Sequence, residues 1–172
     1  MRVRALLFDL FDTLVDLRWE EFPQLEIRGR RVASSARELH AVVCERRAIG
    51  FDAFLEAMAS VDRRLRPATT DAHVELPTRV RFAELARELG IQDPTLPEHL
   101  TRTQMALFCA HSPAPPHHAE LLAQLAAQFR LGLCSNFSDA ETARLVLSRA
   151  GLAEHLSSIA ISEAVGIRKP RR

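Results

Sequence analysis

Val3-Arg4-Ala5-Leu6-Leu7-Phe8-Asp9-Leu10-Phe11-Asp12-Thr13 is the stretch that determines the fold of this 172-residue chain. Its apolar run, Ala5–Phe8, has no polar alternation, which predicts a strand buried on both faces, as in parallel sheets. Such sheets bind ligands at the carboxyl ends of their strands, where Asp9 falls. A carboxylate there can act as a nucleophile or as a metal ligand. The alternative is an ordinary turn or helix cap.

Two later segments repeat this pattern of an apolar strand followed by polar residues. Arg130–Cys134 predicts a second strand, and Ser135 and Asn136 follow it directly. Ser158–Ile161 predicts a third strand, and the loop after it leads to Lys169. Segments with helical spacing separate the three strands. Alternating strands and helices are typical of a doubly wound parallel α/β core.

The order of these polar groups resembles the signature motifs of a known family. Asp9, then Ser135-Asn136, then Lys169-Pro170 resemble the first three motifs of the haloacid dehalogenase (HAD) superfamily, which contains phosphatases, phosphonatases, phosphomutases and dehalogenases. The resemblance implies an α/β fold with a doubly wound, Rossmann-like HAD core and an inserted helical cap. By the same resemblance, the core comprises residues 1–16 and 113–172, and the cap comprises residues 17–112.

The region assigned to the cap shows helical spacing and no convincing strand. The residues from Leu17 to Arg30 look like an exposed connection. Helices are predicted over Val32–Val43, Phe51–Leu65 and Phe82–Leu89, and from Thr95, which has the capping-box spacing Thr95-x-x-Glu98. A second capping box, Ser138-x-x-Glu141, is predicted in the core. Ser112–Pro116 is the candidate hinge. The alternative to a moving cap is a helical subdomain that does not move.

The resemblance also implies roles for the polar residues. Asp9 would be the nucleophile, forming an aspartyl ester with the substrate. Ser135 would donate a hydrogen bond to a phosphoryl oxygen. Lys169, the sole lysine among 23 basic residues, would supply charge and lower the pKa of Asp9. Thr13 would help to shape the loop after Asp9, and Asn136 would orient the turn after the second strand.

One residue departs from the phosphatase pattern. Phosphatases of the superfamily carry a second Asp two residues after the nucleophile as general acid and base, and here Phe11 stands in that position. Asp12 is displaced by one residue, and in an extended segment its side chain would point the other way. Haloacid dehalogenases carry an aromatic residue, Tyr, at that position. They need no general acid there, because halide leaves without taking up a proton. A phosphatase would bind Mg²⁺ through the Asp9 side chain and the Phe11 backbone carbonyl, whereas a dehalogenase-like enzyme would need no cofactor.

A second departure lies at the end of the sequence. Family members continue through a further strand with an acidic Gly-Asp motif, whereas this sequence ends at Arg172. The chain is therefore expected to be truncated after the Lys-Pro motif. The strand Ala5–Phe8 would then be an unpaired hydrophobic edge, which predicts marginal stability, aggregation or an edge-to-edge homodimer.

Three functions remain open at this point. The first is a hydrolase of small phosphoric monoesters, the most common activity in the superfamily. The second is a metal-free hydrolase of carbon–halogen bonds. The third is a truncated, catalytically deficient remnant or a binding protein. In the first two cases the expected partner is a small-molecule substrate.

The composition limits the remaining classes of function. Net charge is +1 and charged residues make up 26% of the chain, so nothing predicts a nucleic-acid or membrane partner. Cys44, Cys109 and Cys134 are odd in number, widely spaced and without a CxxC motif, which argues against a disulfide framework or a zinc site. All three are expected to be small buried hydrophobic side chains in a reducing cytoplasm. The histidines His111, His117 and His118 suggest either a metal site or, as the preferred interpretation, a solvated turn.

Overall fold

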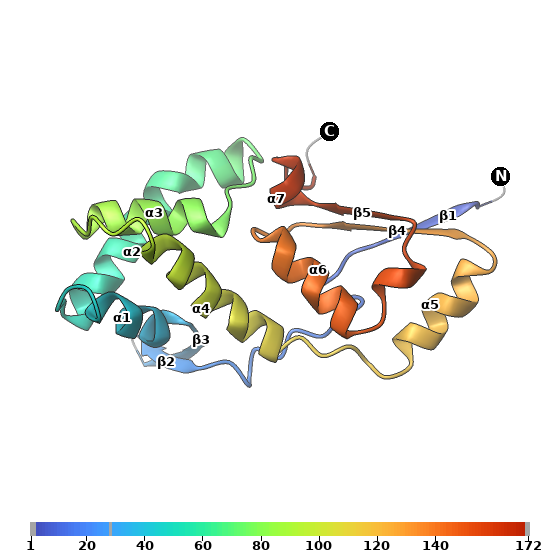
Figure 1. The fold of residues 1–172 in the computed structure, drawn as a ribbon, viewed down its shortest axis with the longest axis horizontal. Helices are drawn as coiled ribbons and strands as arrows, with labels where there is room; N and C mark the ends of the chain where they lie inside the picture. Colours follow the sequence, from blue (N-terminus) through green and yellow to red (C-terminus); the bar gives the residue numbers. More distant parts are fainter. Residues whose placement is uncertain (1–2, 28, 171–172) are drawn as a thin grey trace.

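The computed structural model describes residues 3–27 and 29–170. Its elements, in chain order, are β1 (Ala5–Phe8), β2 (Gln24–Ile27), β3 (Arg30–Ala33), α1 (Ala36–Cys44), α2 (Phe51–Arg66), the π-helical turn η1 (Pro67–Asp71), α3 (Thr78–Glu88), α4 (Leu96–Ala110), α5 (His118–Ala126), β4 (Arg130–Ser135), α6 (Ala140–Arg149), the 3₁₀ turn η2 (Ala153–His155), β5 (Ser158–Ile161) and α7 (Ser162–Val165). Figure 1 shows two parts side by side: a helical part, and a sheet covered by α5 and α6.

The three predicted strands form one parallel sheet in the order β1-β4-β5. The register pairs Phe8 with Leu133 and Leu133 with Ile159, so the strands end at a common edge. Leu6 and Phe8 face α5 and α6, where they pack against a core that includes the fully buried Leu147. The parallel α/β fold predicted from the sequence is confirmed.

The prediction that β1 is buried on both faces is wrong. The Leu7 side chain is 70% exposed, while Leu6 and Phe8 on the other face are half-buried. Among the described residues β1 pairs with β4 alone, and no helix covers the face that carries Leu7 (Figure 1). The register places Leu7 beside Gly132 and Gly132 beside Ser158, so this open face continues across the sheet. An apolar run identifies a strand but does not show that both faces are covered.

We expect this open edge and face to cause self-association. Replacing Leu7 with Lys should shift the protein toward monomer, because a charged side chain on an edge strand opposes pairing with another chain. Sedimentation velocity over a range of protein concentrations would measure the shift. Leu145→Lys is the matched control, since Leu145 is also an exposed leucine but lies on α6. Wild-type protein that stays monomeric at every concentration would contradict the expectation.

The helical part has a core of its own. Phe54 of α2 and Phe82 of α3 are fully buried in it, together with Leu100 of α4. Their burial follows from apolar residues repeating at helical spacing, which places them on one face of each helix. The α-helix α2 ends at Arg66 before Pro67, as the sequence predicts, although the chain continues as the π-helical turn η1.

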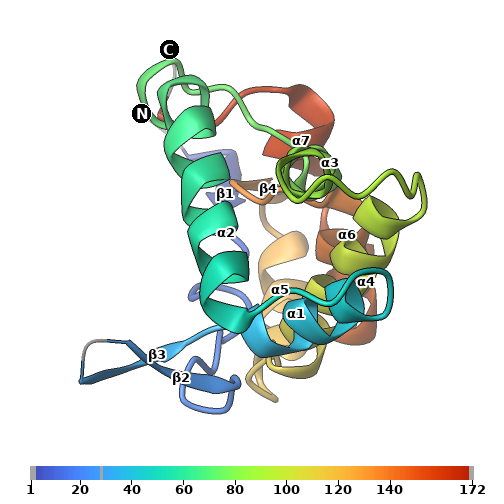
Figure 2. The ribbon, with the colours of Figure 1, turned by 90° about the vertical axis from the view of Figure 1, so that its left-hand side faces the viewer.

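The prediction that this part contains no strand is wrong. β2 and β3 form an antiparallel hairpin, which Figure 2 shows projecting beside α1. The predicted helix from Val32 consequently starts only at Ala36, because Val32 pairs with Leu25 across the hairpin. Leu25 is buried in the helical core, whereas Val32 is exposed. The hairpin was missed because its four-residue strands carry charged residues and only a weak alternation.

Neither predicted capping box forms, and of α4 and α6 only α6 has a side-chain cap, from an aspartate. At α4 the Asp93 carboxylate accepts hydrogen bonds from the backbone amide and hydroxyl of Thr95, and Thr95 makes no cap of its own. At α6 the cap is Asp139, whose carboxylate accepts from the Thr142 amide at 2.9 Å. Ser138 instead bonds the Thr78 hydroxyl at 2.7 Å. Asp is as good an N-cap as Ser or Thr, so the spacing alone could not decide between neighbours.

Two chain segments that run next to each other connect the sheet and the helical part. The Asp16 amide donates to the Pro113 carbonyl, and the Arg18 amide donates to the His111 carbonyl. The predicted hinge therefore lies against the outgoing chain. The division into core residues 1–16 and 113–172 and cap residues 17–112 stays a prediction, and residues 1, 2, 28, 171 and 172 of these ranges lie outside the described residues.

Other predictions concern the cysteines and membrane spans. Cys44 is exposed, contrary to the predicted burial of all three cysteines, because it lies at the end of α1 on its solvent side; Cys109 and Cys134 are half-buried. Within the described residues, every helix is too short or too polar to cross a lipid bilayer.

Candidate active site

The site lies at the carboxyl ends of β1 and β4, where the sequence predicts it. The Lys169 ammonium donates a hydrogen bond to the Asp9 carboxylate, with 2.7 Å between Nζ and Oδ2. The same ammonium donates to the Cys134 carbonyl at 2.6 Å. The buried Ser135 completes the group at the end of β4. Residues separated by 160 positions in the chain thus meet because parallel strands end at one edge of the sheet.

Asn136 fixes the backbone of Lys169. Its side-chain amide donates to the Lys169 carbonyl at 3.0 Å, and its side-chain oxygen accepts from the Lys169 amide at 2.8 Å. These two hydrogen bonds use the backbone donor and the backbone acceptor of a single residue, Lys169. The predicted role of Asn136, orienting a turn, therefore takes a specific form, in which it holds the loop that carries the ammonium.

The surroundings of Asp9 favour its charged form. Partial burial raises the pKa of the carboxyl, but hydrogen bonds from Lys169, Ser135 and the Leu10 amide outweigh it, so the pKa lies below the usual value of 3.8. The Leu10 amide contacts Oδ1 at 2.8 Å, and Lys169 contacts Oδ2. Because the Asp9 and Lys169 side chains are 45% and 39% exposed, solvent screens the pair.

This lowered pKa predicts a pH dependence of stability. A carboxyl with a lower pKa in the folded state than in the unfolded state stabilises the fold above pH 3.8, the usual value, and loses this contribution as pH falls through the folded-state pKa. We expect wild-type protein to be more stable than Asp9→Asn near neutral pH, and the difference to shrink below pH 3.8. Urea unfolding of both proteins between neutral and acidic pH measures this. A difference that does not change with pH would contradict the assignment.

Phe11 belongs to an aromatic cluster. Its ring centroid lies 4.6 Å from that of Phe137 and 6.4 Å from that of Phe108 on α4. Phe108 in turn packs against Phe22 and Trp19 at the edge of the helical part. The position two residues after Asp9 therefore joins the sheet and the helical part through apolar contact and offers no proton donor.

Asp12 does not lie in the extended segment that the sequence predicted, so the expectation that it cannot serve as the acid stays a prediction. Its backbone has φ of 56°, the left-handed region, so the segment is turned at this point and not extended. Its carboxylate accepts from the Leu17 amide at 3.1 Å and so closes the loop. Thr13 is exposed, and its amide makes a 3.4 Å contact with the Leu10 carbonyl. Thr13 is thus part of the loop, as expected.

Comparison with solved structures identifies the fold. A 2-haloacid dehalogenase from Pseudomonas syringae pv. Tomato DC3000 aligns with a TM-score of 0.53 and 17% identity over 96% of this chain and 66% of that one. A protein described as the HAD-hydrolase YfnB from Bacillus subtilis, bound to magnesium, aligns with a TM-score of 0.51 and 20% identity over 99% of this chain and 68% of that one. The chain has the HAD fold. It spans about two thirds of the length of these HAD structures.

Comparisons at the sequence level add nothing to this likeness. No family model matches the chain. No curated protein matches it either. The HAD fold is therefore established by structure, while the activity has to be argued from the residues themselves.

The described residues supply only part of a magnesium site. Both Asp9 oxygens already accept hydrogen bonds, Oδ1 from the Leu10 amide and Oδ2 from the Lys169 ammonium. Within residues 3–27 and 29–170, no group of three or more His, Cys, Asp or Glu side chains is placed to hold a metal ion. With the Asp9 carboxylate and the Phe11 carbonyl as protein ligands, the other oxygens around Mg²⁺ would have to come from water or substrate.

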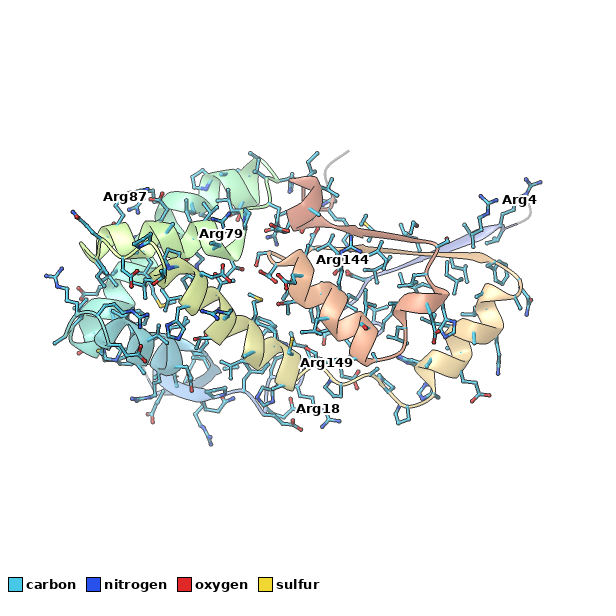
Figure 3. All side chains as sticks on the ribbon, in the orientation of Figure 1. Arg4, Arg18, Arg79, Arg87, Arg144 and Arg149 are labelled. Atoms are coloured by element: carbon cyan, nitrogen blue, oxygen red, sulfur yellow. The ribbon has the colours of Figure 1, made fainter. Side chains whose placement is uncertain are left out.

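Two of the clustered histidines contact residues of the loop after β1 and of the segment that follows it, and the arginines are dispersed. His118 Nδ1 lies 2.9 Å from the Leu14 carbonyl, and His111 Nδ1 lies 3.7 Å from a Glu21 oxygen. The arginines labelled in Figure 3 are spread over both parts of the molecule, from Arg4 beside β1 to Arg87 on α3.

Sequence reasoning missed Glu75. This carboxylate lies between η1 and α3, is buried, and binds Arg168, the residue before Lys169. The only sequence signal was a single charged residue between two apolar ones, Val74 and Leu76. Such a signal cannot specify a partner 93 residues away.

Proposed function

We propose that this protein is a hydrolase in which Asp9 is the nucleophile and forms an ester with a small substrate. The observation that carries the proposal is the 2.7 Å contact between Lys169 Nζ and Asp9 Oδ2 at the end of the parallel sheet. A carboxylate held in its charged form, beside a cation and the Ser135 hydroxyl, suits nucleophilic attack with stabilisation of developing charge. Water then hydrolyses the ester and regenerates Asp9.

The leaving group favoured by the site is one that departs without a proton. Phe11 supplies no acid, and the Asp12 carboxylate is engaged by the Leu17 amide. Halide is such a leaving group, because it is stable as an anion. The proposed reaction is therefore displacement of halide from a 2-haloacid: an Asp9 oxygen forms a bond to carbon, and the carbon–halogen bond breaks with its electron pair leaving on the halide.

Hydrolysis of a phosphoric monoester is the second candidate. What favours it is that the Ser135 hydroxyl and the Lys169 ammonium line one cavity, where they could neutralise phosphoryl oxygens. An alkoxide leaving group, however, requires a proton, and Phe11 stands at the position where the phosphatases of the superfamily carry the acid. The phosphatase hypothesis therefore requires a substrate whose leaving group is stable as an anion, or one that carries its own proton donor.

Ser135, Asn136 and Lys169 line a small cavity of about 200 Å³. A larger cavity between the two parts of the molecule is lined by none of Asp9, Ser135 and Lys169. Its volume is about 450 Å³, and its walls come from α2, η1, α3 and α4 on one side and from Ser138 and Arg168 on the other. Arg81 and Arg168 line it already paired with Asp62 and Glu75. Arg63 and Arg66 also line it and bring net positive charge. This charge favours carboxylate or phosphate groups over neutral molecules.

One assay separates these functions. Halide release from a 2-haloacid and phosphate release from an aryl phosphate are measured side by side, with and without Mg²⁺, for wild type and Asp9→Asn. Metal-independent halide release that is lost in Asp9→Asn supports the first candidate. Phosphate release that is lost in the same variant supports the second. Folded protein active on neither substrate would instead favour a non-catalytic binding protein and contradict the proposal.

A further inference from the structure

Among the carboxylates that form ion pairs in the described residues, that of Glu75 is the least exposed to solvent. Its side chain is 1% exposed, although it belongs to the segment between η1 and α3 in the helical part. One oxygen accepts from Arg168 Nη1 at 2.9 Å, and the other accepts a hydrogen bond from the Ser162 hydroxyl. Both donors lie in the chain after β5, so Glu75 of the helical part is hydrogen-bonded to the part that contains the sheet.

The two partners of Glu75 lead to the two loops of the candidate site. Arg168 directly precedes Lys169. The Ser162 hydroxyl, which donates to Glu75, accepts from the Phe137 amide at 2.9 Å. Phe137 directly follows Asn136, whose side chain holds the Lys169 backbone. The Glu75 carboxylate therefore links the loop after β4 and the loop after β5 at one point.

The backbone supports the same link. The Glu75 amide donates to the Gly166 carbonyl at 3.1 Å, and the Arg168 amide donates to the His73 carbonyl at 2.9 Å. Val74 and Ile167 form an antiparallel bridge between these bonds. The segment 73–75 thus pairs with the segment 166–168, immediately before Lys169. Figure 1 shows this approach, where the chain between α2 and α3 lies closest to α7.

A buried carboxylate needs a fixed arrangement of partners. An unpaired charge in the interior is strongly unfavourable, so Glu75 is stable only where Arg168 and Ser162 are both in reach. If the segment 73–75 moves away, this pairing is lost and the loop before Lys169 loses one of its two supports. Asn136 would then be the only remaining side chain among the described residues that holds the backbone of Lys169.

We propose that Glu75 is a positioning residue that couples the seating of the helical part to the placement of Lys169 against Asp9. The inference rests on the proposed function only in that Lys169 matters for catalysis. With the segment 73–75 seated, the ammonium stays on Asp9 and Cys134. With it released, the ammonium becomes free to leave them. Substrate entry between the two parts would thereby be linked to assembly of the site.

The test uses the fact that Lys169 is the only lysine of the chain. Its acylation by acetic anhydride is followed by peptide mass spectrometry, without any substrate. In Glu75→Gln we expect the rate to rise about fivefold, equivalent to roughly 1 kcal/mol of lost restraint, because the amine is released from its hydrogen bonds. Arg168→Gln should give the same rise, and the double variant should add little to either. If a substrate is known, kcat should fall more than KM rises.

Asp62→Asn is the matched control, because it removes another ion pair of the helical part, with Arg81, that does not contact the Lys169 loop. It should leave the acylation rate unchanged. If Glu75→Gln does not fold, the acylation rate of Arg168→Gln tests the proposal instead. This replacement disturbs the interior less, because the Arg168 side chain is 37% exposed. Folded variants with the acylation rate of the control would overturn the proposal, whether or not the protein is a hydrolase. Loss of activity with unchanged Lys169 reactivity would likewise assign Glu75 a structural role only.

Discussion

Asp9→Asn is expected to abolish hydrolysis, with kcat/KM falling at least about 1,000-fold. A loss of this size is typical when the nucleophile of a set of cooperating catalytic residues is removed. The amide has the same shape as the carboxylate but no nucleophilic oxygen anion. Its carbonyl oxygen can still accept the Leu10 amide or the Lys169 ammonium. The fold should therefore persist, and the loss should appear in kcat. Initial rates of halide or phosphate release measure the change.

Asp12→Asn is the matched control for this prediction. Asp12 lies in the same loop and its carboxylate accepts from the Leu17 amide, which an amide oxygen can also do. Its activity should stay close to that of wild type. Comparable losses in the two variants would indicate that disturbance of the loop, and not removal of a nucleophile, explains the effect of Asp9→Asn.

Lys169→Gln is expected to have the second-largest effect, a fall in kcat/KM of about 100- to 1,000-fold. The ammonium touches Asp9 and the Cys134 carbonyl, so its removal takes away both the charge that keeps Asp9 ionised and a donor for the developing negative charge. The acid limb of the pH–rate profile should also move to higher pH, because without the Lys169 hydrogen bond the pKa of Asp9 returns toward its usual value.

Lys169→Arg distinguishes charge from geometry. A guanidinium keeps the charge but is larger and planar, and cannot reach both acceptors as a compact ammonium does. We expect partial activity, with the acid limb closer to that of wild type than in Lys169→Gln. Arg144→Gln on the exposed side of α6 controls for loss of a positive charge elsewhere. A Lys169→Gln variant with wild-type rates and an unshifted profile would exclude Lys169 from the mechanism.

Features that depend on local patterns of residues could be predicted before the structure was known. The three strands of the sheet and the carboxylate, hydroxyl and ammonium after them could be predicted, because a buried strand needs an apolar run and a polar residue at its end is conspicuous. The helices of the second part followed from helical spacing, as with Phe54 and Val61 on the buried face of α2. Phe11 could also be recognised as a departure, since it needs only its position after Asp9.

Which residues meet, and which faces of the sheet and helices are covered, became clear only from the folded chain. The exposure of Leu7 depends on what packs against the sheet, and the hairpin of β2 and β3 depends on pairing across a turn. Glu75 reaches Arg168 only because two segments 93 residues apart are brought together. Local sequence records propensity and periodicity, whereas burial and ion pairing arise from contacts between distant segments, which no short window of sequence contains.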